Sequence, residues 1–136
     1  MTEDIRRDLI AYKMDAARNL IVEVKSHIEN GFYNTAMNRM YYACFCAASA
    51  LLIAEKVPES KRHATVRNLF NLHFVKTGRF APEWGVFYSN IMNCREAADY
   101  EDFKIYTKKE TEERFLPTRK FVELVEKELK EQYFID

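Results

Sequence analysis

The sequence is poor in glycine, proline and cysteine, and it carries no net charge. Three Gly and three Pro among 136 residues are too few for the many turns of a β-sandwich or β-barrel, and they leave no glycine-rich phosphate loop. Twenty-one Lys and Arg balance twenty-one Asp and Glu, so no global field draws the protein to nucleic acid or to an acidic membrane. No apolar run approaches the roughly 18 to 20 residues of a membrane span. These absences favour a helical protein outside the membrane.

The three cysteines form an odd number in apolar surroundings, and the chain starts with charged residues instead of a signal peptide. The reducing cytoplasm fits these features best. Cys44 and Cys46 stand about 200° apart around a helix axis, so they cannot share one tetrahedral ion. The histidines show no i, i+4 pair, and we expect no metal and no other cofactor. Cys94 would be a nucleophile only beside a histidine and an acid.

Apolar residues recur at helical spacing in five segments that are joined by short connections. The segments are 3–30, 33–56, 61–77, 82–99 and 108–132. We therefore predict an all-α fold, a single up-and-down bundle of about five helices, with residues 1–136 forming one domain. The second segment is apolar around most of its circumference and rich in small side chains. It should be the most buried helix, with its neighbours close to it.

The first segment carries two neighbouring apolar lines. One line is Ile5, Leu9, Tyr12, Ala16, Leu20 and Val24, the flanking line is Ile10, Met14, Ala17, Ile21 and Ile28, and together they predict one long amphipathic helix. Thr2 is placed to cap this helix and Gly31 to end it. Thr107 and Glu110 form a capping box for the last helix, and Pro117 predicts a kink or a break within it.

Charge is segregated along the second half of the chain. Residues 61–79 hold five bases and no acid, whereas residues 96–113 hold seven acids and three bases. The simplest interpretation is a pair of solvated faces, complementary across a subunit contact. The alternative is a phosphate- or RNA-facing strip, because the basic residues stand beside aromatic ones. Those aromatic residues are Phe70, Phe74 and Phe80.

A few polar residues interrupt the apolar helices. Arg39 lies in the middle of the most apolar helix beside Tyr42, so its guanidinium must reach water or find an acid and hydroxyls. Arg95 and Asp99 share a helix face, and Asp99 could pair with Arg95, with Arg39 or with both. Such a network could fix the register of the bundle. With His63 nearby, the two arginines could instead form an anion site suited to phosphate. All five are candidate ligand-binding residues.

Three segments together resemble the signature of HEPN domains, named for higher eukaryotes and prokaryotes nucleotide-binding. They are residues 38–45 (NRMYYACF), 61–66 (KRHATV, leading to Phe70) and 95–100 (REAADY). The likeness covers almost the whole chain and is closest to an uncharacterised prokaryotic branch. It implies a small helical bundle, commonly dimeric and often encoded with a minimal nucleotidyltransferase in toxin–antitoxin pairs.

Many HEPN relatives are metal-independent RNases whose signature is an Arg followed after four to six residues by a His. The resemblance implies that His moves a proton from the ribose hydroxyl while Arg holds the phosphate, leaving a cyclic phosphate. After Arg95 the corresponding positions hold Tyr100, Glu101 and Asp102, none of them a histidine. A tyrosine titrates near 10, and the acids would repel RNA phosphate. Arg95 and Tyr100 are the candidate catalytic residues, and His63 could enter the same cleft.

Three functions follow as alternatives. The leading hypothesis is a HEPN-like module, a homodimer, that binds a nucleotide, RNA or a nucleotidyltransferase partner without efficient catalysis. The rival is a weak or partner-activated metal-independent endoribonuclease that uses Arg95 with Tyr100 or His63. The third is a structural bundle whose apolar faces serve only for association.

Overall fold

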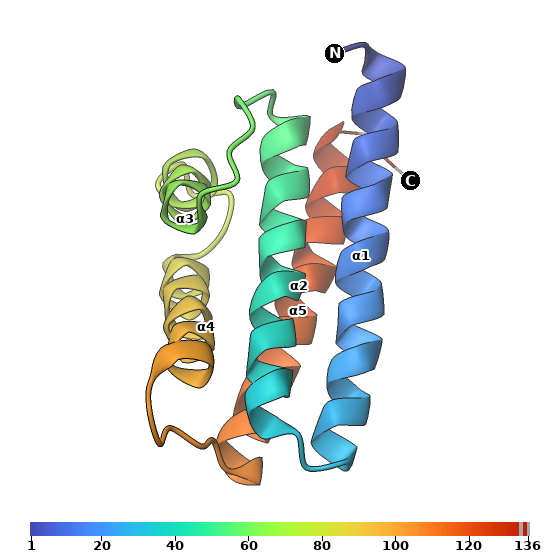
Figure 1. The fold of residues 1–136 in the computed structure, drawn as a ribbon. Helices are drawn as coiled ribbons and strands as arrows, with labels where there is room; N and C mark the ends of the chain where they lie inside the picture. Colours follow the sequence, from blue (N-terminus) through green and yellow to red (C-terminus); the bar gives the residue numbers. More distant parts are fainter. Residues whose placement is uncertain (134, 136) are drawn as a thin grey trace.

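The computed structural model describes residues 1–133 and 135, and in that part of the chain it contains five α-helices, one short π-helix and no strand (Figure 1). The α-helices are α1 (Glu3–Glu29), α2 (Tyr33–Ala54), α3 (His63–Phe70), α4 (Pro82–Tyr100) and α5 (Lys108–Tyr133), and the π-helix η1 (Asn71–Val75) continues α3. The predicted all-α bundle of about five helices is confirmed.

Helix α2 is the centre of the bundle. It contacts α1, α4 and α5, and in Figure 1 α1 lies on one side of it while α3 and α4 lie on the other. Most of its residues are buried, as predicted, and alanines line its middle. Because those side chains are small, helix axes can pack close to α2. Residues on α2 can therefore reach partners on both sides of the bundle.

The predicted helix ends are confirmed at several points. Thr2 Oγ1 accepts a hydrogen bond from the backbone N–H of Ile5 at 3.2 Å, and Gly31 adopts a left-handed φ of 79° after α1. At the start of α5, Glu110 accepts from the N–H of Thr107 at 3.0 Å, and Thr107 Oγ1 accepts from the N–H of Glu110 at 3.1 Å. This is the reciprocal capping box that the sequence predicted.

Helix α1 buries only part of its apolar residues, since Ile5 and Tyr12 are 55% and 71% exposed. The flanking line supplies most of the buried residues. The buried side chains of α1 are Ile10, Met14, Ala17 and Val24. Helix α1 packs against both α2 and α5, so the stripe that faces the seam between them is the one that becomes buried.

The third and fifth helices also differ in detail from the sequence patterns. The predicted helix over 61–77 begins at His63 and changes at Asn71 to a π-helix, in which the N–H of Lys76 donates to the Asn71 carbonyl. Helix α4 passes close by, since a Cβ at Gly85 would lie 2.7 Å from Asn71 Oδ1. Pro117 lies inside α5 without ending it. None of the described helices is long and apolar enough to cross a membrane.

Candidate functional site

Arg95 of α4 is surrounded by tyrosines. Its Nη2 donates to Tyr42 Oη at 3.1 Å and to Tyr100 Oη at 3.4 Å. The guanidinium carbon lies 5.4 Å from the ring centroids of both residues and 5.8 Å from that of Tyr41. Only 12% of the Arg95 side chain is exposed. The aromatic faces stabilise the cation and hold it at a fixed place between α2 and α4.

Asp99 connects Arg95 to helix α2. Its Oδ2 lies 3.0 Å from Arg95 Nε, one turn earlier on α4, and it accepts a hydrogen bond from Asn38 Nδ2 at 2.9 Å. Partial burial of Arg95 would lower the pKa of its guanidinium, but Tyr42, Tyr100 and Asp99 outweigh this effect and raise it. The charge on Arg95 is therefore permanent, and Asp99 partly compensates it.

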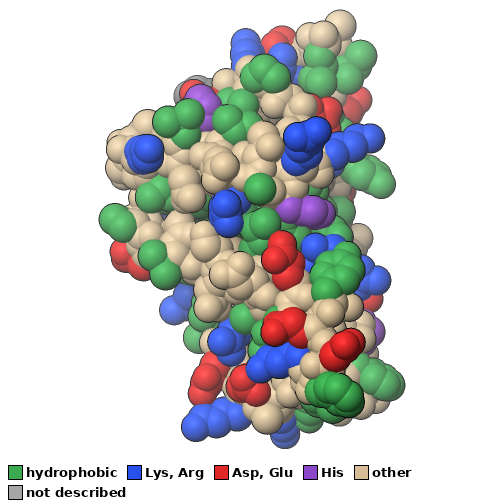
Figure 2. Space-filling view, turned by 60° about the vertical axis from the view of Figure 1, so that its left-hand side comes forward, with side chains coloured by type: hydrophobic (Ala, Val, Ile, Leu, Met, Phe, Trp, Pro, Cys, Tyr) green, Lys and Arg blue, Asp and Glu red, His purple; other side chains and the backbone are tan. Residues whose placement is uncertain are grey.

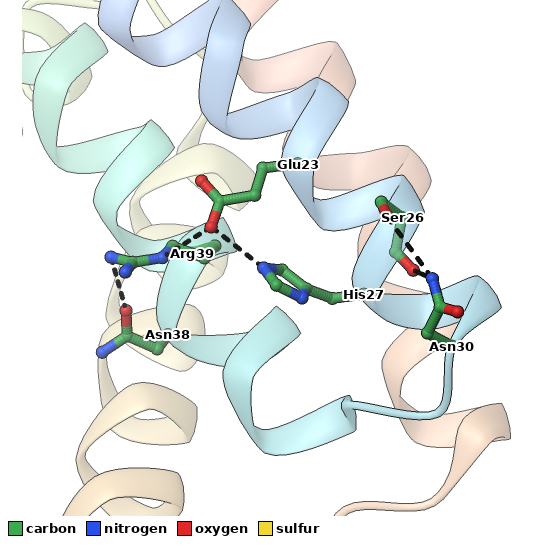
Figure 3. Close-up of polar contacts among 6 residues, drawn as sticks. All are labelled: Glu23, Ser26, His27, Asn30, Asn38 and Arg39. Carbon is green, nitrogen blue, oxygen red and sulfur yellow. Dashed lines mark hydrogen bonds and ion pairs between the residues drawn. The ribbon is translucent and has the colours of Figure 1, made fainter.

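Arg39 pairs with an acid on α1. Its Nε lies 3.2 Å from Glu23 Oε1, and the same oxygen lies 2.9 Å from His27 Nε2 (Figure 3). The hydrogen bond from His27, with the charges of Arg39 and His27, lowers the pKa of Glu23 against the opposing effect of burial. Arg39 Nη1 also donates to Asn38 Oδ1 at 3.3 Å. Of the pairings open to Asp99, the structure contains the one with Arg95 and not a direct one with Arg39.

His63 is the first residue of α3 and packs on the aromatic residues of α2. Its Nδ1 lies 2.6 Å from Tyr41 Oη, and its ring centroid lies 4.8 Å from that of Phe45 and 5.8 Å from that of Tyr42. Burial and the charge of Arg95 lower the pKa of His63, while Glu96 acts against them. The imidazole is consequently neutral at pH 7.

An open groove of about 640 Å³ runs between α2 and the end of α4. Its lining comprises Asn34, Thr35, Asn38, Arg39, Tyr42, Ala98 and Asp99. Three of the predicted binding residues therefore line one groove. Arg95 and His63 do not line the groove but contact Tyr42, since Arg95 donates to its hydroxyl and His63 packs on its ring. The structure thus brings all five predicted binding residues into one continuous cluster.

Tyr100, the residue at the position of the family's histidine, is 72% exposed at the end of α4. Its hydroxyl accepts a hydrogen bond from Arg95 Nη2 at 3.4 Å. A phenol there can donate a hydrogen bond to a phosphate oxygen. It is a poor base at neutral pH, and the imidazole of the cluster comes from α3 instead.

The aromatic residues of the basic segment cannot form the stacking surface that the alternative interpretation requires. Phe70, Phe74 and Phe80 are almost completely buried, where they pack against one another and against Phe121. Their spacing was that of a core stripe, so no base can stack on them. Arg79 is also engaged, with Glu55 and Glu128. Figure 2 shows that Lys and Arg are interspersed with Asp and Glu on the α3 and α4 side.

The cysteines have the surroundings of core residues. Cys44 is fully buried, and burial raises the pKa of its thiol well above the usual range. Cys94 is also buried, and its Sγ faces Asn90 Oδ1 at 3.8 Å. Within residues 1–133 and 135, no group of three or more His, Cys, Asp or Glu side chains could hold a metal ion.

Sequence reasoning missed two residues that organise the site. Glu23 was not assigned a partner, although it holds both Arg39 and His27. Asn34 donates to the carbonyl of Lys104 at 2.8 Å and accepts from the N–H of Tyr106 at 2.9 Å, which fixes the loop after Tyr100. The only available signal for Asn34 was a polar residue at the start of an apolar helix.

Comparison with known proteins gives a consistent result. Residues 12–129 match the family described as HEPN domain. The chain is 35% identical over 131 residues to a Methanocaldococcus jannaschii protein named "putative toxin", and the match covers 96% of each chain. It is 33% identical over 96 residues to a second Methanocaldococcus jannaschii protein named "putative toxin", and that match covers 70% of this chain and 64% of the relative. It is 32% identical over 122 residues to a UPF0332 protein of Thermotoga maritima, covering 90% of this chain and 92% of the relative.

Proposed function

The chain belongs to the HEPN domain family, and from this membership we propose that it is the HEPN half of a toxin–antitoxin pair, a module that binds a nucleotide or RNA. Two relatives carry the word toxin in their names. A toxin requires an antitoxin, and the resemblance to HEPN domains indicates a minimal nucleotidyltransferase in that role. We place the module, a single domain over residues 1–136, in the cytoplasm.

The observation that carries the proposal is the position of Arg95 beside the groove. A guanidinium with tyrosine hydroxyls at 3.1 and 3.4 Å offers a phosphate several donors at one point. Arg39 lines the same groove with a side chain that is 41% exposed, so a second cation is within reach of solvent. The exposed ring of Tyr100 can stack on a base.

The proposed module is a homodimer. Its support is the separation of charge along the sequence, with bases over 61–79 and acids over 96–113, because segments of opposite charge on two copies attract each other. A molar mass near 16 kDa by light scattering at micromolar concentration would refute the dimer.

The binding test uses Arg39→Ala with fluorescence anisotropy of a labelled single-stranded RNA at low salt. We expect Kd to increase about fivefold or more, because a charge-assisted contact is lost, while the thermal midpoint stays within about 2 °C. Arg7→Ala is the matched control, since Arg7 is exposed on α1 away from the groove. Equal affinities of the two variants would contradict the assigned groove.

A second candidate is a metal-independent endoribonuclease. It is favoured by one observation, that His63 and Arg95 flank the same two rings, Tyr41 and Tyr42. The test is incubation of the purified protein with structured RNA in EDTA. Cleavage that disappears in Arg95→Ala would support the nuclease, and intact RNA at high protein concentration would exclude it.

A further inference from the structure

A buried tyrosine hydroxyl stands behind His63. Tyr41 is fully buried, and its Oη is the partner of His63 Nδ1 at 2.6 Å. Tyr88 of α4 is also fully buried, with its ring centroid 6.1 Å from that of Tyr41. Burial raises the pKa of Tyr41 to about 12 and also raises the pKa of Tyr88 well above its ordinary value. Both phenols therefore keep their protons at neutral pH.

The direction of the hydrogen bond between Tyr41 and His63 follows from which acceptors the tyrosine hydroxyl can reach. Tyr88 Oη forms no hydrogen bond with any described residue, so Tyr88 takes no part in the contact between Tyr41 and His63. A buried hydroxyl without an acceptor is unfavourable, and in the described part of the chain His63 Nδ1 is the one hydrogen-bond partner of Tyr41 Oη. The proton of Tyr41 then points to His63 Nδ1. A neutral imidazole that accepts at Nδ1 carries its own proton on Nε2.

The groups around His63 keep its imidazole neutral. The groups that face His63 are Tyr41 and Tyr42 from α2, and Arg95 and Glu96 from α4. Arg95 disfavours a second proton on the imidazole, and the contact with Tyr41 occupies Nδ1. In the described part of the chain, Nε2 has no hydrogen-bond partner. It is the nitrogen left to meet a ligand.

We propose that Tyr41 fixes His63 as the Nε2–H tautomer, so that His63 donates a hydrogen bond to a phosphate oxygen held by Arg95. This inference rests on the proposed binding function and states its chemistry. A nitrogen that already carries a proton cannot take one from a ribose hydroxyl. The contact with Tyr41 that makes His63 a hydrogen-bond donor to phosphate therefore prevents His63 from replacing the histidine that is missing after Arg95.

The tautomer is measured directly by long-range nitrogen–proton NMR on the ¹⁵N-labelled protein at pH 7.5. We expect the His63 signals, assigned by their loss in His63→Gln, to show the Nε2–H form. Tyr41→Phe removes only the hydroxyl and should leave a mixture of the two tautomers. The control is Tyr12→Phe, because Tyr12 is exposed on α1 and should leave His63 unchanged.

Binding is measured in parallel by titration with inorganic phosphate and with a short RNA. Tyr41→Phe should weaken phosphate binding by roughly three- to tenfold, the size of one hydrogen bond to a charged group. A dominant Nδ1–H form in the unmodified protein would overturn the role of Tyr41 in fixing the tautomer of His63. If phosphate binding still depended on Arg39 in that case, the proposed function would stand. The expected tautomer without any binding of phosphate or RNA would overturn both the donor role and the proposed function.

Discussion

Asn34 is expected to contribute more to stability than any other exposed or half-buried amide of the site. At the start of α2, its Nδ2 donates to the carbonyl of Lys104 at 2.8 Å and more weakly to that of Ala98 at 3.4 Å. Its Oδ1 accepts from the N–H of Tyr106 at 2.9 Å. One side chain thereby joins α2 to the end of α4 and to the loop that leads into α5.

The magnitude for Asn34→Ala follows from these bonds. The two short bonds contribute about 1 kcal/mol each, and the abandoned N–H of Tyr106 adds a desolvation cost of similar size. Alanine returns about 0.5 kcal/mol through its higher helix propensity. The net loss in the free energy of unfolding is about 2.5 kcal/mol, which corresponds to a fall in Tm of about 6 to 10 °C.

The assay is urea unfolding followed by far-UV circular dichroism. The matched control is Asn30→Ala, because the Asn30 side chain bonds only within the end of its own helix, to the Ser26 carbonyl at 2.8 Å and to its hydroxyl at 3.5 Å. We expect the midpoint to fall for Asn34→Ala with an unchanged m value. A loss below about 0.5 kcal/mol, or one no larger than that of the control, would refute the role of Asn34.

Three further predictions concern stability. The pKa of His63 is lowered on folding from its ordinary value of 6.5, so the unfolded chain binds the proton first as the pH falls. The free energy of unfolding should therefore decrease as the pH drops below about 6.5. His63→Gln should flatten this part of the pH profile in urea unfolding. Pro117→Ala restores a backbone N–H inside α5 and should raise the free energy of unfolding by about 1 to 2 kcal/mol in the same assay; a decrease would show that proline is preferred there. Arg79→Ala breaks the pairs with Glu55 and Glu128 and should cost roughly 1 kcal/mol, less in 1 M NaCl; no dependence on salt would count against the ionic contribution.

Much of the fold could be predicted because its signals are local. The capping box of Thr107 and Glu110 and the burial of α2 depend on residues close in sequence or on composition. The phase of α1 could not be predicted in the same way. Ile5 and Ile10 belong to two neighbouring apolar stripes of similar strength, and the packing of α2 and α5 decides which stripe becomes buried.

In the candidate site, too, contacts within one helix could be predicted and contacts between helices could not. The pairing of Arg95 with Asp99 was predictable, since residues four apart on a helix are neighbours. The pairing of Arg39 with Glu23 joins two helices, and its distance in sequence does not distinguish Glu23 from other acids of α1. The position of His63 was predicted only as near the arginines, because its contact with Tyr41 depends on how α3 packs on α2.

The paired charges of the site determine what kind of ligand it can hold. Arg95 has Asp99 beside it and Arg39 has Glu23, so an anion that enters must compete with a carboxylate already present. The net gain for a single phosphate is small under these conditions. An RNA strand can contact both cations at once and stack a base on Tyr100. The binding free energies of these contacts add together, while the entropy lost when the ligand is immobilised opposes binding only once. The site therefore favours RNA over a free phosphate ion, and the preference should shrink as salt screens the outer of the two cations.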